Sequence, residues 1–391
     1  MRSFHKSILL FIGIAFCSSA CAPAASDADL DMEVTIESMP MAQGAFFPDS
    51  FTGGTEKVWF DCALEVPEDF SPEDFELPTV TGLQPTDRDA VYKKYVEGQT
   101  VAEEHTFPPS LNQPEGRTVY VFKDGEEIIG EVAIGGGFNC TVAELIGASV
   151  YPESAEGASQ ENAVAFGSGE YCVSQAKEEL AEVSFPVEEY EFYWFSLDAE
   201  ELDDLTQQIL QQAGEGTEDF VLDALDVPAE GWDETANRYR IYAWQQYGGL
   251  TVFPLNMSTD EAMAKESYQS APVSCDYNWQ GMTGMYVRAP YAFEPTGQHA
   301  DFLPFTEIVS AVVRKYTYLL DFSTQDMASG ETEETDTYSV TRAKLALRVY
   351  LDEGENYAAE PIWYFEVQRS GASKQNILFF NALTGREIYL A

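Results

Sequence analysis

One alternating run near the end of the chain constrains the fold more than any other feature. Its residues, "SVTRAKLALRVYLDEG", occupy positions 339–354. Within it every second residue from Ala343 to Leu351 is apolar, and the residues between them are mostly polar. A period of two residues places these two sets on opposite faces of a β-strand. The run therefore predicts a strand with one buried and one polar face, and the rest of the fold must cover the buried face.

The segments after this run predict further strands that end at the C-terminus. The residues "PIWYFEVQR" at 361–369 begin with proline, which a strand tolerates at its first position. The apolar "NILFF" then leads through the turn "ALTG" at 382–385 into "REIYL" at 386–390. Gly385 stands where such a turn needs a left-handed backbone. A closing hairpin explains why this chain has an apolar end, whereas chain ends are usually polar and poorly ordered.

The segment before the run predicts a helix over residues 305–322. Its apolar residues Ile308, Val312, Tyr316 and Leu319 recur at the spacing of one helical face. A helix with such a face needs an apolar partner. We therefore expect the C-terminal hairpin to pack against this helix.

The earlier chain shows shorter strand and helix patterns. Residues 57–67 alternate as a strand, and Asp124-Gly125 between two apolar runs predicts a β-hairpin. Residues 169–183 place their apolar side chains on one helical stripe. The sequence therefore predicts an α+β fold with two units of antiparallel sheet packed with helices, at 56–185 and 186–391. We expect the second unit to contain a helix followed by a three- to four-stranded antiparallel sheet.

The second predicted unit opens with an aromatic strand. The residues "YEFYWFSL" at 190–197 are followed by Asp198 and Glu201, a capping pair for a helix. Two more strands are predicted on either side of Gly248-Gly249.

The composition fixes the broad class of protein and disfavours some partners. The formal net charge is −46, while 45% of the residues are hydrophobic and 13% are aromatic. This hydrophobic content predicts a globular chain. The negative field repels nucleic acid, so no nucleic-acid partner is expected. The same field permits a cationic peptide as a partner.

The first residues predict export and a lipid anchor. Residues 1–20 combine basic residues, a short apolar run at 8–16 and small residues, as in a signal peptide. "SSAC" follows and resembles a bacterial lipobox, which would make Cys21 the lipidated N-terminus and hold the protein on the extracytoplasmic face of the cell membrane. The alternative is ordinary cleavage and secretion. Residues 21–55 lack a sustained period and predict a flexible tether.

Four cysteines remain after the predicted signal peptide and lipobox are set aside. In an exported chain they are candidates for up to two disulfides. The alternative is that each is a buried free thiol. They are Cys62, Cys140, Cys172 and Cys275.

Three basic side chains of the alternating run form a candidate site. Arg342, Lys344 and Arg348 share the polar face of one predicted strand in a strongly acidic chain. They could pair with carboxylates on neighbouring strands, such as Glu366 or Glu387. The alternative is a site for a small anion or a protein partner.

The sequence carries no motif of a known catalytic site. The serine nucleophile elbow, the metalloprotease helix, the phosphate-binding loop and the calcium loop are all missing from it. We therefore assign no catalytic residue, no metal ligand and no cofactor. Two carboxylates working as in glycosidases remain the alternative, since an acidic chain brings many carboxylates together by chance.

The end of the chain resembles a family. "EPIWYF" followed by "NALTG" is similar to the P-x-W-x-F and N-A-x-x-G pattern of uncharacterised Firmicutes cell-surface lipoproteins that contain a domain of unknown function. "CALEVP", "TANRYRIYAWQQYGGLTVF", "LPFTEI" and "VTRAKLALRVYL" follow the same order, and the resemblance is strongest after residue 236. The motif residues Trp363, Asn381 and Gly385 are predicted to be structural, as a buried aromatic and turn formers.

A more distant similarity is to the extracytoplasmic regulators YycH and YycI and to PepSY-type modules. Both resemblances imply a layered α+β fold and a regulatory or inhibitory binding role outside the cell. YycH and YycI have an N-terminal transmembrane helix, whereas this chain has a predicted lipid anchor, so their mode of action is not carried over. We expect a non-enzymatic binding or regulatory module whose partners are the membrane, through its anchor, and another envelope protein or a cationic peptide.

Overall fold

The computed structural model describes most of the chain after residue 33. The described residues are 34–389, except for 69, 110–115, 143–149, 153–154, 156–165, 214–221, 223–224, 226, 229, 255–266, 326–335 and 373–374. Residues 34–391 form one compact unit. The predicted signal peptide and Cys21 lie outside the described residues.

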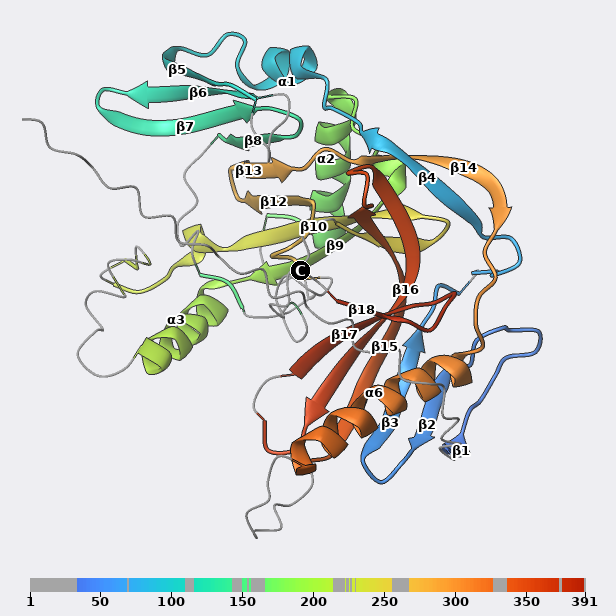
Figure 1. The fold of residues 1–391 in the computed structure, drawn as a ribbon. Helices are drawn as coiled ribbons and strands as arrows, with labels where there is room; N and C mark the ends of the chain where they lie inside the picture. The colour runs from blue at the N-terminus through green and yellow to red at the C-terminus, as the bar shows by residue number, and fades with distance from the viewer. Residues whose placement is uncertain are drawn as a thin grey trace, which may run out of the picture. The chain divides into compact units, whose positions relative to one another are not determined.

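The fold is α+β, as predicted. Its helices pack beside a large mixed sheet (Figure 1). The helices are α1 (Arg88–Tyr95), α2 (Gly169–Glu182), α3 (Ala199–Ala213) and α6 (Phe305–Gln325). No helix in the described part of the chain has both the length and the hydropathy that crossing a bilayer requires.

The main sheet contains all but two of the strands found in the described residues. Its first strands along the chain are β1 (Thr35–Ser38), β2 (Ser50–Gly54), β3 (Val58–Glu65), β5 (Val101–Phe107), β6 (Arg117–Asp124), β7 (Glu127–Ile134), β8 (Phe138–Thr141) and β9 (Tyr190–Leu197). Its later strands are β10 (Arg238–Tyr247), β11 (Leu250–Phe253), β12 (Val273–Asn278), β13 (Gly281–Val287), β15 (Tyr338–Leu351), β16 (Tyr357–Arg369), β17 (Gln375–Asn381) and β18 (Glu387–Ile388). The separate two-stranded sheet consists of β4 (Glu76–Leu83) and β14 (Tyr291–His299).

Strand β15, the alternating run of the sequence, is bonded to strands on both sides. It pairs with β16 in antiparallel register from Tyr338↔Arg369 to Leu351↔Tyr357. On its other edge it pairs in parallel first with β3 and then with β11. The four strands β15 to β18 are antiparallel neighbours after α6, but they continue into the larger sheet through β3 and β11.

The predicted division into two units with separate sheets is not confirmed. Strand β3 of the first predicted unit pairs with β15 of the second, and β8 pairs with β13. Backbone groups of strands that lie far apart in the sequence satisfy one another, so no boundary at residue 185 separates two sheets.

The predicted tether at 21–55 is wrong for two short segments. Strand β1 pairs with β2, and β2 pairs with β3. Gly53 and Gly54 permit this close pairing because they have no Cβ atom. A Cβ atom at Gly54 would lie 2.1 Å from the Val58 carbonyl oxygen.

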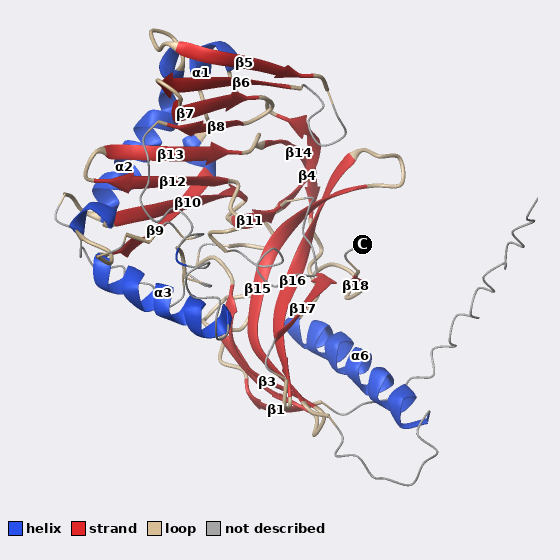
Figure 2. Ribbon diagram, turned by 90° about the vertical axis from the view of Figure 1, so that its left-hand side faces the viewer, coloured by secondary structure: helices blue, strands red, loops and turns tan. Residues whose placement is uncertain are grey.

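Helices cover the sheet in two places (Figure 2). Helix α2 buries Cys172, Ala176 and Leu180 in a core that also contains Ile241 and Val273 of the sheet. At α6, the Phe305 ring lies 4.8 Å from the Trp363 ring and 5.7 Å from the Phe51 ring, measured between centroids. The predicted helices at 169–183 and 305–322 are therefore both present and packed.

The C-terminal hairpin forms as predicted. Strand β17 pairs with β18 through Phe379↔Ile388 and Phe380↔Glu387. Asn381 holds the turn, because its side-chain oxygen accepts hydrogen bonds from the amides of Leu383 and Thr384 at 3.0 and 2.9 Å. Gly385 adopts φ of +65°, a conformation that favours glycine.

The hairpin is also tied to α6. Glu387 forms an ion pair with Lys315 of α6, and the Leu303 amide, just before the helix, donates to the Ala382 carbonyl at 3.0 Å. Trp363 is fully buried. The motif residues Trp363, Asn381 and Gly385 are thus structural, as predicted.

Replacing Asn381 with alanine tests the turn. We expect Asn381→Ala to lower the free energy of unfolding by about 1–3 kcal/mol, because two turn amides lose their acceptor. Asn376→Ala is the matched control, since Asn376 lies exposed on the same strand, and its effect should stay within about 0.5 kcal/mol. Urea unfolding measures both, and equal midpoints for the two variants would contradict this account of the turn.

Candidate functional site

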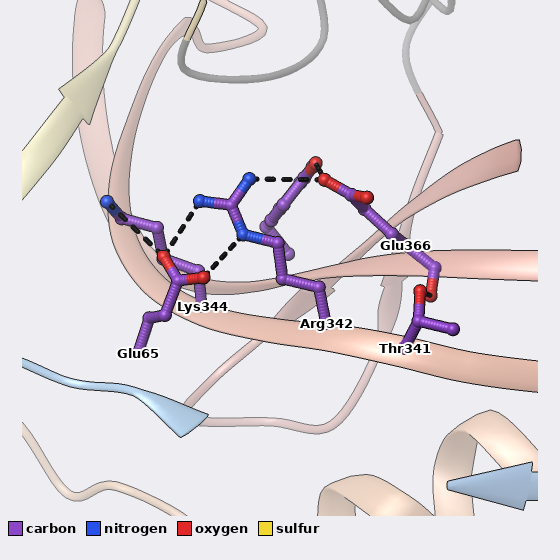
Figure 3. Close-up of polar contacts among 6 residues, drawn as sticks. Glu65, Thr341, Arg342, Lys344 and Glu366 are labelled. Atoms are coloured by element: carbon purple, nitrogen blue, oxygen red, sulfur yellow. Dashed lines mark hydrogen bonds and ion pairs between the residues drawn. The ribbon is translucent and has the colours of Figure 1, made fainter. Parts of the chain in front are cut away.

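The three predicted basic residues all have carboxylate partners. Arg342 is bonded to Glu65 of β3 through Nε–Oε1 at 2.5 Å and Nη2–Oε2 at 2.8 Å, and its Nη1 lies 3.1 Å from Glu366 Oε1 (Figure 3). Lys344 Nζ lies 4.0 Å from Glu65 Oε2. Arg348 Nη1 lies 2.9 Å from Glu360 Oε1.

This network favours cross-strand pairing over an anion site. The predicted partner Glu366 is confirmed, whereas Glu387 pairs with Lys315 instead. An anion at these basic side chains would have to displace carboxylates that already compensate them. The network also joins β3 and β16 to β15 through side chains.

The pKa of Glu65 is lowered by the basic side chains beside it. Partial burial acts to raise the pKa of Glu65, but the hydrogen bonds and charge of Arg342, with the charge of Lys344, outweigh it and lower the pKa. The carboxylate form is therefore favoured in the folded protein.

The four cysteines are free and buried, so the disulfide alternative is not what the structure shows. Burial raises the pKa of Cys62 and Cys140 to about 12 and that of Cys172 to about 11. Burial also raises the pKa of Cys275. Thiols in this state are protonated and unreactive at neutral pH.

A groove at a different place is the better candidate for a binding site. Its volume is about 670 Å³, within the range typical of sites for small ligands. The side chains that line it come from the end of α1 and the residues after it, from α2, and from the turn between β12 and β13. Those with a polar or aromatic group include Lys94, Tyr171, Gln175, Glu179, Tyr277 and Trp279.

The turn between β12 and β13 presents an exposed tryptophan. Asn278 pairs with Gly281, which leaves Trp279 and Gln280 as a two-residue loop. The Gln280 amide donates to the side-chain oxygen of Asn278 at 2.8 Å, and Gly281 adopts φ of +107°. Asparagine and glycine thus stabilise the turn. Trp279 remains 58% exposed, although an aromatic side chain of this size is usually buried.

Helix α2 supplies a second exposed aromatic side chain. The helix begins after Ser168, whose hydroxyl accepts a hydrogen bond from the Tyr171 amide at 3.1 Å. This N-cap fixes the first turn, where Tyr171 lines the groove and is 56% exposed. Two large aromatic faces are therefore open to solvent at one groove.

An ion pair joins α1 and α2 beside these aromatic residues. Lys94 Nζ lies 2.6 Å from Glu179 Oε2 and also pairs with Glu182. The Tyr95 hydroxyl lies 3.3 Å from Glu179 Oε2. Partial burial acts to lower the pKa of Lys94, but its hydrogen bonds to Glu179 and Glu182 outweigh burial and raise it.

Tyr277 lines the groove, but its hydroxyl oxygen is covered by neighbouring side chains. The residue is only 5% exposed, and its hydroxyl forms no hydrogen bond with any part of the chain that the structure describes. Burial, then the nearby Cys275 and Glu179, raise the pKa of Tyr277, so it stays a protonated donor. A buried hydroxyl without a partner costs about 1–3 kcal/mol.

The groove is suited to binding. Glu179 is the single carboxylate among its described lining residues, whereas glycoside hydrolysis needs two. No group of three or more histidine, cysteine or acidic residues that could hold a metal ion occurs in the described ranges. Aromatic faces beside amides and one ion pair can hold a ligand by stacking and hydrogen bonding.

Sequence reasoning did not find the groove residues. Tyr171 and Tyr277 stand in patterns that predict a helix and a strand, and nothing local marks them as neighbours. One signal was available in "DYNWQGMT", where a tryptophan stands between Asn278 and Gly281 in a tight turn. Turn positions usually hold small or polar residues, so a tryptophan there indicates a contact surface.

Comparisons with known proteins show the fold alone. A scan of protein-family models and a search of curated proteins found no match. Among solved structures, an uncharacterized protein from Eubacterium rectale is similar with a TM-score of 0.54 and 12% identity, over 88% of this chain and 94% of that one. At this identity the likeness establishes a shared fold without indicating an activity.

A second solved structure aligns less well. It is the C-terminal domain of YpeB from Bacillus megaterium, with a TM-score of 0.29 and 8% identity, over 78% of this chain and 96% of that one. A TM-score this low does not support a common fold.

The Glu65–Arg342 pair predicts a pH-dependent contribution to stability. We expect Glu65→Gln to lower the free energy of unfolding by about 1 kcal/mol at pH 7, a discounted value because the Glu65 side chain is 41% exposed. The pKa of Glu65 is lowered from 4.5. The contribution is therefore present above about pH 4.5 and is lost as the pH falls through the lower folded value.

Urea unfolding between pH 7 and pH 3 measures this difference. The curves of wild type and Glu65→Gln should converge at the acidic end. Glu353→Gln, at an exposed turn position, is the control and should follow wild type throughout. A constant difference between wild type and Glu65→Gln at every pH would show that the ion pair is not its cause.

Proposed function

We propose that this protein is a non-enzymatic binding or regulatory module on the extracytoplasmic face of the cell membrane. The observation that carries the proposal is the groove in which Trp279 and Tyr171 are both exposed. Large aromatic side chains that stay open to solvent at a concave site are typical of contact surfaces. The sheet holds α1, α2 and the β12–β13 turn in position, and side chains of these three elements would contact the ligand.

The content of the groove supports binding over hydrolysis. Glu179 already pairs with Lys94 and accepts a hydrogen bond from Tyr95. Glycoside hydrolysis of the common kind needs a second carboxylate across the reacting bond, and the described lining residues do not include one. We therefore propose a ligand that is held and not chemically changed.

The sequence resemblance supports the proposed location. The end of the chain is similar to Firmicutes cell-surface lipoproteins, and more distantly to PepSY-type extracytoplasmic modules. Lipidation of Cys21 would attach the protein to the membrane, and a component of the cell envelope would be its partner. The net charge of −46 disfavours nucleic acid and permits a cationic peptide elsewhere on the surface.

Labelling with a fatty-acid analogue tests the anchor. We expect the wild-type chain to carry the label in the membrane fraction, because two acyl chains make attachment durable. The variant Cys21→Ser should lose the label and appear in the medium or the soluble fraction. Cys62→Ser is the control and should remain labelled, since Cys62 lies in strand β3. A wild-type chain that is unlabelled and released would end the lipoprotein proposal.

Binding to native envelope fragments tests the groove. The chain purified from the cells that make it should bind fragments of their envelope, and Trp279→Ala should weaken binding about tenfold or more, as loss of a central aromatic contact does. Tyr286→Ala is the matched control, because Tyr286 is an exposed aromatic residue on β13 outside the groove. Equal binding by wild type and Trp279→Ala would place the contact elsewhere.

A further inference from the structure

We infer that the groove binds a neutral oligosaccharide, which stacks on Trp279 and Tyr171 and offers a hydroxyl group to Tyr277. The inference rests on the proposed function, because it assigns a class of ligand to the same groove. Three properties of the lining residues lead to it: exposed aromatic faces, side-chain amides with balanced charge, and a buried hydroxyl without a partner among the described residues.

The aromatic faces suit sugar rings. One face of a pyranose ring carries mainly C–H groups, and these pack on an aromatic ring, while the hydroxyl groups at its edge stay free for hydrogen bonds. Trp279 and Tyr171 come from different elements, the β12–β13 turn and the first turn of α2. Two platforms from two elements favour a ligand with more than one ring.

The polar side chains of the groove suit hydroxyl groups. An amide group donates through its nitrogen and accepts through its oxygen, as a hydroxyl group also does. The side-chain amides of Gln99 and Gln280 line the groove and are exposed. Gln175 donates to Glu178 at 3.2 Å through its nitrogen, which orients its oxygen. Such groups match a ligand rich in hydroxyls better than one rich in apolar side chains.

The charges of the groove favour a neutral ligand. Lys94 and Glu179 are the charged side chains among the described lining residues; they pair at 2.6 Å, and Lys94 also pairs with Glu182, so no lining cation is left for an anion. An anionic polymer would also meet the repulsion of a chain with net charge −46. Charge complementarity therefore selects a neutral ligand at this place.

Tyr277 explains why a ligand hydroxyl would be favoured. Its buried hydroxyl has no partner within the described residues and is held in the protonated form. Neighbouring side chains cover this oxygen in the structure, so a ligand reaches it only when they move aside. A sugar hydroxyl that then lies beside it would satisfy a hydrogen bond that the protein alone leaves unmade. Tyr277→Phe should then weaken binding and leave the folded protein equally or more stable, whereas a merely structural tyrosine would show no loss of binding.

Titration with soluble oligosaccharides tests the inference. The probes are neutral oligomers of glucose, mannose, xylose and N-acetylglucosamine of about two to six units, measured by calorimetry and tryptophan fluorescence with the natively purified chain. We expect at least one series to bind, about tenfold or more weaker to Trp279→Ala, and about 3- to 10-fold weaker to Tyr277→Phe. Trp279→Phe should retain part of the affinity.

Tyr190→Phe is the matched control for Tyr277→Phe. The Tyr190 hydroxyl is also buried without a partner among the described residues, but Tyr190 does not line the groove. Its removal should leave oligosaccharide binding unchanged. Equal effects of the two substitutions on binding would overturn the role of Tyr277. Thermal unfolding of both variants checks that each one folds.

The outcomes separate this inference from the proposed function. If no neutral oligosaccharide binds or displaces envelope fragments, while those fragments still bind through Trp279, the assigned ligand class is wrong and the binding role stands. Displacement of the fragments by a short peptide in place of sugars would lead to the same conclusion. If fragment binding is unaffected by Trp279→Ala, the proposed function itself fails.

Discussion

The pairing of β15 on both edges is the constraint on which the rest of the structure depends. This strand is bonded to β16 along one edge and to β3 and β11 along the other. Its basic side chains are therefore held inside a sheet, where a charge without a partner is costly. Glu65, Glu360 and Glu366 compensate them. Glu65 and Arg342 are 277 positions apart in the sequence, so one ion pair joins the beginning and the end of the described chain.

Local patterns predicted the elements of this fold but not their neighbours. The period of two in β15, the helical face of α6 and the capping pair Asp198–Glu201 depend on residues a few positions apart. The sequence was therefore sufficient for them. A period of two indicates which face of a strand is buried, but it does not say which strand lies beside it. For this reason the β3–β15 and β8–β13 pairings were missed, and two units were predicted where one sheet continues.

The groove could not be predicted from local sequence patterns either, because its residues are neighbours only in the folded chain. Its lining residues come from separate segments near positions 94–99, 142, 166–179 and 277–282, and the sheet and helices bring them together. The helix end and the helix face look ordinary by themselves, and the hairpin is unusual only in the tryptophan of its turn. The basic residues of β15 looked unusual in an acidic chain, yet their carboxylates came from strands β3 and β16, which local pattern could not place. Basic residues are scarce in this acidic chain, yet those of β15 belong to a structural network, and the candidate binding site lies elsewhere.

An unmet hydrogen bond by itself does not mark a site in this protein. The indole nitrogens of Trp244 and Trp363 also lack partners among the described residues, and both side chains are fully buried in the core. Tyr277 differs because it lines a groove whose other walls carry exposed aromatic faces. Proteins tend to break the rules of packing and hydrogen bonding where function requires it. Exposed Trp279 and Tyr171 break one rule and the unmet Tyr277 hydroxyl breaks another, both at one groove, and the proposed ligand would relieve both.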